Sequence, residues 1–374
     1  MLPLTARVYV CVCVILFLHN RYRATGGEER AVENLMWLVR ERLGEDAELL
    51  ERDSGTLRRT TAAAGMLRGG LHPDEVARAV RRTGARVVHA HNIHPAFGWR
   101  ALAAARDAGA RVVLHLHQYR LVCAVGVCFT QGAECTRCHG RNTLGGVLHN
   151  CRASRAEAIT YATSLALWQR RIAASVDAFV VPSEFAAARL RELGAPIADA
   201  HVVPHPIPEI ATAAAPRKGG YALLAARLEP EKGLDTAIAA CAIAGVPLVV
   251  AGAGSERERF EGTAGVTFAG EVGHVELTRL RAGAGVALVP SKFAETFGFA
   301  AAEAMAAGLP VAASRIGALP EIVPDDWLVP PDDAQALSTT LRHLRGNAAA
   351  AEQGLARMRE TCARAATTLA AVYS

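Results

Sequence analysis

Residues 287–308 read ALVPSKFAETFGFAAAEAMAAG and combine the end of a strand, a turn and a helix. The strand is the apolar run at the start, and Gly308 ends the helix, as glycine commonly does. Glu295 therefore lies in the loop at the carboxyl end of the strand, and Glu303 lies about one turn into the helix. Ligands of open α/β sheets bind at the carboxyl ends of strands. The stretch predicts one strand–helix unit of an α/β fold with a ligand site at its turn.

The start of this helix is suited to binding an anion. Its first backbone N–H groups, near Phe297, Gly298 and Phe299, have no partner within the helix and lie at the positive end of the helix dipole. A carboxylate such as Glu295 or Glu303 can hold neighbouring hydroxyl groups by accepting two hydrogen bonds. Two carboxylates beside an anion site suit a ligand with sugar, diphosphate and ribose parts. An ordinary capped helix with incidental glutamates would carry the same residues.

A second charged turn follows another apolar run. Residues 226–233 read ARLEPEKG, at the end of the strand expected at 221–226. Arg227 and Lys232 can converge on one phosphate-sized anion at the head of the next helix, Arg227 as a planar fork and Lys232 as a point charge. A solvated charged turn is the alternative. Because both motifs end strands of the same half of the chain, a shared ligand site is favoured.

Apolar runs and amphipathic segments alternate along the whole chain, which predicts parallel sheets covered by helices. We expect strands at 8–18, 47–51, 86–91, 111–117, 178–181, 221–226, 247–251, 286–290 and 310–313, and helices at 29–43, 73–83, 99–108, 156–174, 184–193, 234–244 and 299–307.

A stretch with four prolines, His201–Lys218, separates two alternating halves. The pattern predicts an α/β protein of two doubly wound Rossmann-like domains that face each other across a cleft. We expect the first domain at 1–203, a linker at 204–219 and the second domain at 220–374. The last helix is expected to pack back on the first domain.

Two further residues of the first half are candidates for ligand contact. Gly26 and Gly27 follow the first expected strand, where glycine lets the backbone approach a ligand closely and start a helix. His117 is the last residue of the strand expected at 111–117, and His115 is close to it. A histidine within a sheet is more often a core residue, but at the end of a strand facing a cleft we favour a functional role.

Composition excludes some classes of protein. The chain has 374 residues, 51% hydrophobic and 21% charged, with a formal net charge of +5. Lys and Arg do not gather in a block with aromatic residues, so nucleic-acid binding is not expected.

The run Val8–Leu18 is too short to span a bilayer and no small-residue cleavage site follows it. We interpret it as a buried strand rather than a targeting segment, and expect a cytoplasmic protein, with weak attraction to the inner face of the membrane left open.

Residues 118–152 interrupt the alternation and carry five of the nine cysteines. A loop of this length is normally functional or held by something other than a core. Cys123, Cys135, Cys138 and Cys151 have a spacing that can close a tetrahedral zinc site, with Cys128, His139 and His149 as spare ligands. A redox disulfide and plain loop thiols are the alternatives. The odd number of cysteines argues against a disulfide scaffold.

Taken together, these residues resemble glycosyltransferase family 4, a group of retaining enzymes with the two-domain GT-B architecture. The resemblance covers most of the chain and is most specific in the motifs of the second half. Further matching stretches are Phe17–Asn20, Ala90–Pro95, Val181–Phe185 and Pro320–Val323.

The resemblance implies a role for each candidate residue. Arg227 and Lys232 would hold the diphosphate of a nucleotide-sugar donor, with the helix start at Phe297 and Gly298. Glu295 would bind the hydroxyls of the transferred sugar, and Glu303 would bind the ribose. Gly27 would approach the diphosphate and the acceptor, and His117 would help to position the sugar. The family needs no metal for catalysis. The acceptor would attack from the face that the diphosphate leaves, and it would be a glycan, a lipid-linked molecule or a small molecule. The reaction would serve synthesis of a cell-surface polysaccharide or glycoconjugate.

The chain departs from the family pattern at a few positions. Lys292 and Phe293 stand where an aromatic or acidic residue is usual, and His205 stands where asparagine is common. The stretch Tyr119–Cys123 and the four-cysteine spacing resemble a subgroup of the family, which supports the structural zinc.

Three other functions remain as alternatives. A nicotinamide-dependent dehydrogenase needs three glycines in its fingerprint, and Ala251–Arg257 lacks the third. A sugar-nucleotide epimerase of the same architecture would share the donor motifs, and a phosphorylase would need a cofactor lysine pocket. A non-catalytic zinc-dependent interaction protein would explain the cysteines but not the donor motifs.

Overall fold

The computed structural model describes residues 14–22, 26–197, 199–208 and 220–374. The chain divides into two compact units. Unit 1 comprises residues 1–115, 168–179 and 372–374, and unit 2 comprises residues 116–167 and 180–371. The domain boundaries expected at 203 and 220 remain a prediction. Part of the first expected strand, residues 8–13, and part of the expected linker, residues 209–219, lie outside the described residues.

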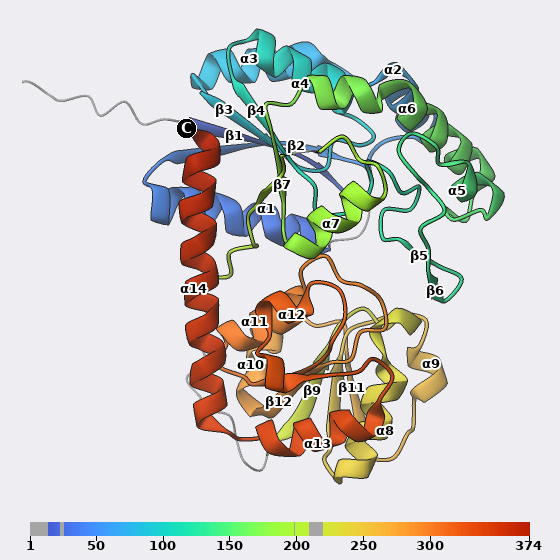
Figure 1. The fold of residues 1–374 in the computed structure, drawn as a ribbon, viewed down its shortest axis with the longest axis vertical. Coiled ribbons are helices and arrows are strands. Elements are labelled where there is room, and N and C mark those ends of the chain that lie inside the picture. The colour runs from blue at the N-terminus through green and yellow to red at the C-terminus, as the bar shows by residue number, and fades with distance from the viewer. Residues whose placement is uncertain (1–13, 23–25, 198, 209–219) are drawn as a thin grey trace, which may run out of the picture. The chain divides into compact units, whose positions relative to one another are not determined.

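The first sheet has six strands in the order β2-β1-β3-β4-β7-β8, and Figure 1 shows how its strands run between helices. The pairs β1–β2, β1–β3, β3–β4 and β7–β8 are parallel. Residues 15–18 of β1 are completely buried, as expected for a strand covered on both faces. The strands are β1 (Val14–Arg21), β2 (Asp46–Asp53), β3 (Val87–Ala90), β4 (Arg111–His115), β7 (Ala178–Val181) and β8 (His201–Val202).

In the described part of the chain, five of the six helices that alternate with these strands begin and end close to the expected positions, whereas α2 was not expected. Ser183 is the N-cap of α7, where serine is strongly preferred, and its hydroxyl accepts a hydrogen bond from the backbone N–H of Ala186 at 3.0 Å. The elements are α1 (Gly27–Leu38) with a π-helical continuation (Val39–Leu43), α2 (Arg59–Arg68), α3 (Pro73–Thr83), α4 (Gly98–Asp107), α6 (Arg155–Ala174) and α7 (Glu184–Glu192).

The second sheet also has six strands, in the order β11-β10-β9-β12-β13-β14, and every neighbouring pair is parallel. This is the doubly wound order of dinucleotide-binding folds, in which the connections reverse direction between the first and fourth strands, here β9 and β12. The strands are β9 (Tyr221–Ala225), β10 (Leu248–Ala251), β11 (Val266–Gly270), β12 (Ala284–Val289), β13 (Val311–Ser314) and β14 (Leu328–Val329).

Helices cover both faces of the second sheet, and α8 and α13 pack side by side (Figure 1). Within the described residues, no helix is both long and apolar enough to cross a membrane. The helices are α8 (Leu234–Ala244), α9 (Arg257–Phe260), α10 (His274–Gly283), α11 (Phe299–Ala306), α12 (Leu319–Ile322), α13 (Ala334–Leu344) and α14 (Ala348–Tyr373). The last residue of α14, Tyr373, belongs to unit 1, where its hydroxyl lies 2.7 Å from His89 Nδ1.

Two expectations about local structure were wrong. The strand β4 ends at His115, so His117 lies in the following loop rather than on the strand. The cysteine-rich loop does contain regular structure, namely the two-stranded antiparallel ribbon β5 (Phe129–Thr130) and β6 (Ala133–Glu134), and the short helix α5 (Leu144–Leu148). Such short elements carry too few residues to show a hydrophobic period in the sequence.

Candidate active site

The strand order brings the two charged turns of unit 2 together. Lys232 follows β9 and Glu295 follows β12, and these strands are neighbours at the reversal point of the sheet. Lys232 Nζ donates a hydrogen bond to Glu295 Oε1 at 2.9 Å. Both side chains are mostly buried, with exposed fractions of 15% and 13%. The two charged motifs therefore lie next to each other in the structure. The ligand-binding roles of Lys232 and Glu295 remain predictions.

Glu295 is held as a carboxylate by its neighbours. Burial alone would raise the pKa of Glu295, but the Lys232 ammonium and a hydrogen bond from the Ser291 hydroxyl, at 2.7 Å, outweigh it and lower that pKa below its ordinary value. Both hydrogen bonds end on Oε1. A charged, well-oriented carboxylate is therefore built into the turn after β12.

Backbone packing fixes the shape of this turn. Gly298 is the N-cap of α11 and has φ of 99°, in the left-handed region that favours glycine. A Cβ at Gly298 would lie 2.6 Å from Leu319 Cδ2, and one at Gly317 would lie 2.5 Å from the backbone nitrogen of Glu295. The backbone N–H of Ala318 donates to the Glu295 carbonyl at 2.9 Å. The loop that carries Glu295 is thus held from two sides.

The cations of the site differ in exposure. Arg227 has a 65% exposed side chain and a long contact with Glu231, 3.5 Å between Nη2 and Oε1. Lys232 lies over the ring of Phe293, 4.4 Å from its centroid. Lys292, where the sequence departs from the family, is paired with Asp235 at 2.9 Å and Asp332 at 2.6 Å. Arg227 is therefore the cation most accessible to a ligand, and Lys292 is neutralised by two carboxylates.

Glu303 has a partner that the sequence did not indicate. Arg281, near the end of α10, donates from Nη2 to Glu303 Oε2 at 2.6 Å, and its side chain is 4% exposed. The two residues lie 22 positions apart on different helices. No local pattern links them, so only the packing of α10 and α11 on the sheet reveals the pair.

His117 is placed within unit 2 by a stack of rings. Its imidazole stacks on that of His205 with centroids 5.1 Å apart, and His205 stacks on Phe299 at 4.8 Å. His205 also meets the ring of Phe297 edge-on at 4.9 Å. Burial lowers the pKa of His205 to about 3, so this ring is neutral. His205, which the sequence assigned only to the linker, thus connects His117 to the first residues of α11.

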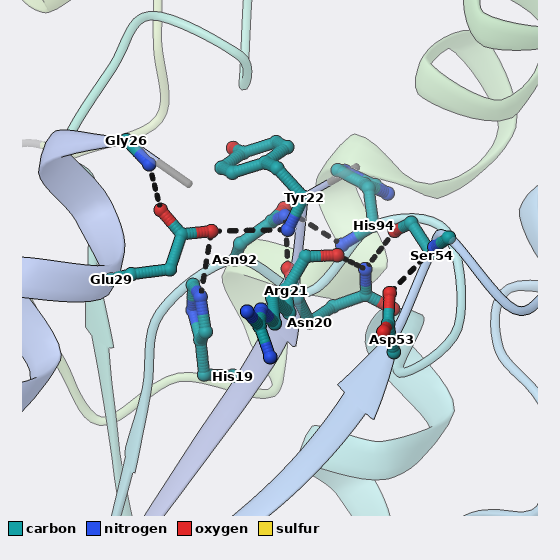
Figure 2. A network of polar contacts seen from close by, with 11 residues as sticks. His19, Asn20, Arg21, Tyr22, Gly26, Glu29, Asp53, Ser54, Asn92 and His94 are labelled. Atoms are coloured by element: carbon teal, nitrogen blue, oxygen red, sulfur yellow. Dashed lines mark hydrogen bonds and ion pairs between the residues drawn. The ribbon is translucent and has the colours of Figure 1, made fainter. Parts of the chain in front are cut away.

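Gly27 lies in unit 1, at the first position of α1, after the N-cap Gly26. Figure 2 shows that Glu29 holds this helix start: its carboxylate accepts from the backbone N–H of Gly26 at 2.8 Å and of Tyr22 at 3.1 Å. Its Oε1 also lies 3.6 Å from His19 Nε2. Burial raises the pKa of Glu29, but these hydrogen bonds outweigh it and lower the pKa to about 2.

The ends of neighbouring strands in unit 1 are also tied to each other (Figure 2). Asn92 Nδ2 donates to the Asn20 carbonyl at 2.6 Å, and the Asn20 side chain donates to Ser54 Oγ. These residues follow or end β3, β1 and β2. Side-chain hydrogen bonds therefore tie together the ends of β1, β2 and β3.

The cysteines of residues 118–152 lie around one cavity in unit 2. Its lining includes the four expected ligands and Cys128, whereas His139 and His149 are not part of it. A ring carbon of His139 would lie 2.5 Å from a Cβ at Gly194, so this imidazole packs on the chain at Gly194. The structure brings the cysteines together and separates the two spare histidines from them.

Family models match both halves of the chain. One, described as "Glycosyl transferase 4-like domain", matches residues 16–206, and another, described as "Glycosyl transferases group 1", matches residues 219–347. The chain belongs to this family of glycosyltransferases. The resemblance inferred from the sequence motifs is thereby confirmed at the level of the family, whereas the four-cysteine subgroup remains a prediction.

Characterised relatives match parts of the chain. The glycogen synthase of Mycobacterium tuberculosis is 35% identical over 154 residues, 37% of this chain and 37% of that protein. An MMP alpha-(1->4)-mannosyltransferase of Mycolicibacterium hassiacum is 48% identical over 73 residues, 18% of each chain. The matched part is thus little more than a third of the length of the glycogen synthase.

Solved structures resemble the whole chain. The sucrose-phosphate synthase of Thermosynechococcus elongatus has a TM-score of 0.63 at 19% identity, over 96% of both chains. The Anabaena protein HepE, solved in complex with UDP-glucose, has a TM-score of 0.59 at 16% identity, over 96% of this chain and 99% of that one. At these identities the likeness concerns the fold, and it confirms the predicted fold of two Rossmann-like domains.

Proposed function

We propose that the chain is a retaining glycosyltransferase that moves a sugar from a nucleotide-diphosphate-sugar donor to a glycan, a lipid-linked or a small-molecule acceptor. The observation that carries the proposal is the Lys232–Glu295 pair at the reversal point of the second sheet. Open α/β sheets bind their ligands at such points. A fixed cation and a fixed carboxylate side by side match the diphosphate and the sugar hydroxyls of one donor.

The donor diphosphate would be bound by cations and backbone N–H groups. The Lys232 ammonium has three hydrogens, of which one points to Glu295, so it can serve a phosphate without leaving the carboxylate. Arg227 is exposed and can turn its guanidinium onto the same phosphates. The first N–H groups of α11, near Phe297 and Gly298, add the positive end of a helix. The same groups would stabilise the charge that develops as the diphosphate leaves, without a metal.

Glu295 and Glu303 would hold the two sugars of the donor. Glu295 Oε1 is engaged by Lys232 and Ser291, which orients the carboxylate so that Oε2 can accept from the transferred sugar. Glu303, oriented by Arg281, would accept from the ribose hydroxyls. His117 would position the sugar, and the stack on His205 restricts its ring to one orientation. The acceptor would approach the face from which the diphosphate departs, with Gly27 offering close backbone approach.

The proposal extends to the biological role and the location of the protein in the cell. We expect a role in synthesis of a cell-surface polysaccharide or glycoconjugate, in the cytoplasm. The formal net charge of +5 would allow weak attachment to an anionic inner membrane surface.

A donor panel tests the proposal most directly. UDP-, GDP- and dTDP-sugars are added to the purified protein and thermal unfolding is followed, since a bound donor raises the unfolding temperature. We expect one nucleotide class to stabilise the protein, and Lys232→Ala to abolish that shift. Arg279→Ala is the matched control, because Arg279 is an exposed cation paired with Glu276 on α10.

Analysis of the reaction products distinguishes a glycosyltransferase from an epimerase. Incubation with the stabilising donor and a mixture of acceptors should give a glycoside with the anomeric configuration of the donor. Conversion of the donor to another sugar nucleotide without acceptor would indicate an epimerase. Binding of no sugar nucleotide by the folded protein would contradict the proposal.

A further inference from the structure

Residues 118–152 enclose a cavity whose wall is unusually rich in sulfur. Five cysteines line it: Cys123, Cys128, Cys135, Cys138 and Cys151. A tetrahedral zinc site needs four thiolates. One of the five cysteines would therefore be left out of such a site. The spacing of the cysteines along the sequence does not decide which one.

The ribbon β5–β6 places two of these cysteines next to each other. Phe129 pairs with Glu134 in the antiparallel register, and Cys128 and Cys135 are the residues next to this pair, Cys128 with a left-handed φ of 52°. The backbone N–H of Cys135 donates to the Cys128 carbonyl at 2.8 Å. The backbones of Cys128 and Cys135 are therefore neighbours at the base of the ribbon, and both side chains line the cavity.

Cys123 and Cys138 adjoin this pair. The side chains of Cys123 and Cys128 are hydrogen-bonded to each other, and Cys138 follows Cys135 by the short spacing typical of zinc sites. Cys123, Cys128 and Cys138 are buried, with exposed fractions of 6%, 4% and 8%. Cys135 and Cys151 are both half-buried. Cys151 follows α5 and is not part of the ribbon.

Several N–H groups point at these sulfurs, as in the outer shell of a metal–thiolate site. The backbone N–H of Gly126 donates to Cys123 Sγ at 3.4 Å, and Arg137 Nη1 donates to Cys135 Sγ at 3.6 Å. Such donors stabilise sulfur as a thiolate, which is the form that binds metal.

The geometry points to a structural zinc site formed by Cys123, Cys128, Cys135 and Cys138, with Cys128 rather than Cys151 as the fourth ligand. Within the described residues, no three cysteine sulfurs lie within 4.8 Å of one another. Zinc–sulfur bonds of about 2.3 Å bring the sulfurs to about 3.8 Å from each other. Metal binding therefore draws the four side chains together and fixes the ribbon relative to the segments before and after it.

The site would stiffen a wall of the candidate active site. Phe129, the residue after Cys128, meets the ring of Phe293 edge-on at 6.1 Å. Phe293 in turn lies beneath the Lys232 ammonium. This consequence rests on the proposed function, whereas the metal site itself does not.

Metal content and thiol protection test the site without any activity assay. The protein is purified without chelator, and zinc is measured in the parent and in single Cys→Ser variants. We expect about one zinc per chain in the parent, in Cys151→Ser and in the control Cys241→Ala. Cys241 is a buried cysteine of α8 outside the cavity. We expect Cys128→Ser and Cys135→Ser to lose the metal.

If the Cys→Ser variants do not fold, a second measurement on the parent protein tests the same site. The parent protein is alkylated with iodoacetamide with zinc present and after chelation, and labelled cysteines are identified by mass spectrometry. Cys128 should be protected by zinc, and Cys151 should be labelled in both conditions. Full zinc content in Cys128→Ser, zinc-dependent protection of Cys151 instead of Cys128, or failure of the parent to bind added zinc would each overturn the inference.

Discussion

Lys232 Nζ lies 2.9 Å from Glu295 Oε1, although the two residues are 63 positions apart in the sequence. Each follows one of two adjacent parallel strands, β9 and β12. The contact joins the two charged motifs of the second sheet into one candidate ligand site, and the first predictions concern Lys232 and Glu295.

Replacing Glu295 by Gln should lower turnover by a factor of about 10 to 150, because a hydrogen bond to a charged group contributes about 1.5–3 kcal/mol. Glu295→Ala should abolish transfer. The fold should remain, since the loop is held through the backbone at Gly317 and Ala318. Steady-state rates with the stabilising donor check this. Glu276→Gln, an exposed carboxylate on α10, is the control. Near-normal turnover of Glu295→Gln would show that the site lies elsewhere.

Arg227→Ala and Lys232→Ala should each weaken binding of the nucleoside diphosphate by about 1.5–3 kcal/mol. Binding of the nucleoside without phosphates should stay unchanged, because in the proposed function the two cations contact only the phosphates of the donor. Calorimetric titration of both ligands measures the difference. Arg227→Ala should leave the unfolding temperature unchanged, since Arg227 is exposed, whereas Lys232→Ala should lower it by depriving Glu295 of its cation. An equal loss for both ligands would mean that the cations are structural.

Arg281→Met should destabilise the protein by about 3–5 kcal/mol, because it removes one member of a buried ion pair and leaves the Glu303 carboxylate buried. The double variant Arg281→Met with Glu303→Leu should recover most of that loss, since a buried pair can be replaced by apolar groups. Urea unfolding of both variants provides the free energies. A loss below about 1 kcal/mol for the single variant would show that the pair does not persist in solution.

Glu29→Gln should reduce the stability of the protein and remove part of its dependence on pH. The pKa of Glu29 is lowered from 4.5 to about 2 in the folded chain. Its stabilising contribution is therefore complete above pH 4.5 and is lost as the pH falls toward 2. A shift of this size corresponds to about 3 kcal/mol at most. Urea unfolding at pH 7 and at pH 3.5 measures it: the gap between parent and variant should narrow at the lower pH. A gap that is the same at both values would refute the role of the carboxylate charge.

The alternation of strands and helices could be predicted from the sequence because it is a local property. Parallel strands covered on both faces require continuous apolar runs, so segments such as Ile15–Leu18 are visible in the sequence itself. The turns after β9 and β12 were visible for the same reason, since a charged motif directly after an apolar run marks the end of a strand. The ribbon β5–β6 was missed because two-residue strands have no period.

The partners of the candidate residues depend on contacts between distant segments, and no local pattern encodes them. Arg281 meets Glu303 only because α10 and α11 pack on one sheet, and His117 meets His205 across 88 positions. Cys128 was only a spare ligand candidate in the sequence, and the backbone hydrogen bond from Cys135 to Cys128 became visible only in the folded chain. The sequence determined the elements, the family and the residue types at the ends of the strands. The order of the strands, which sets the distance between Lys232 and Glu295, was decided by tertiary packing, because burying both faces of each sheet fixes which strands become neighbours.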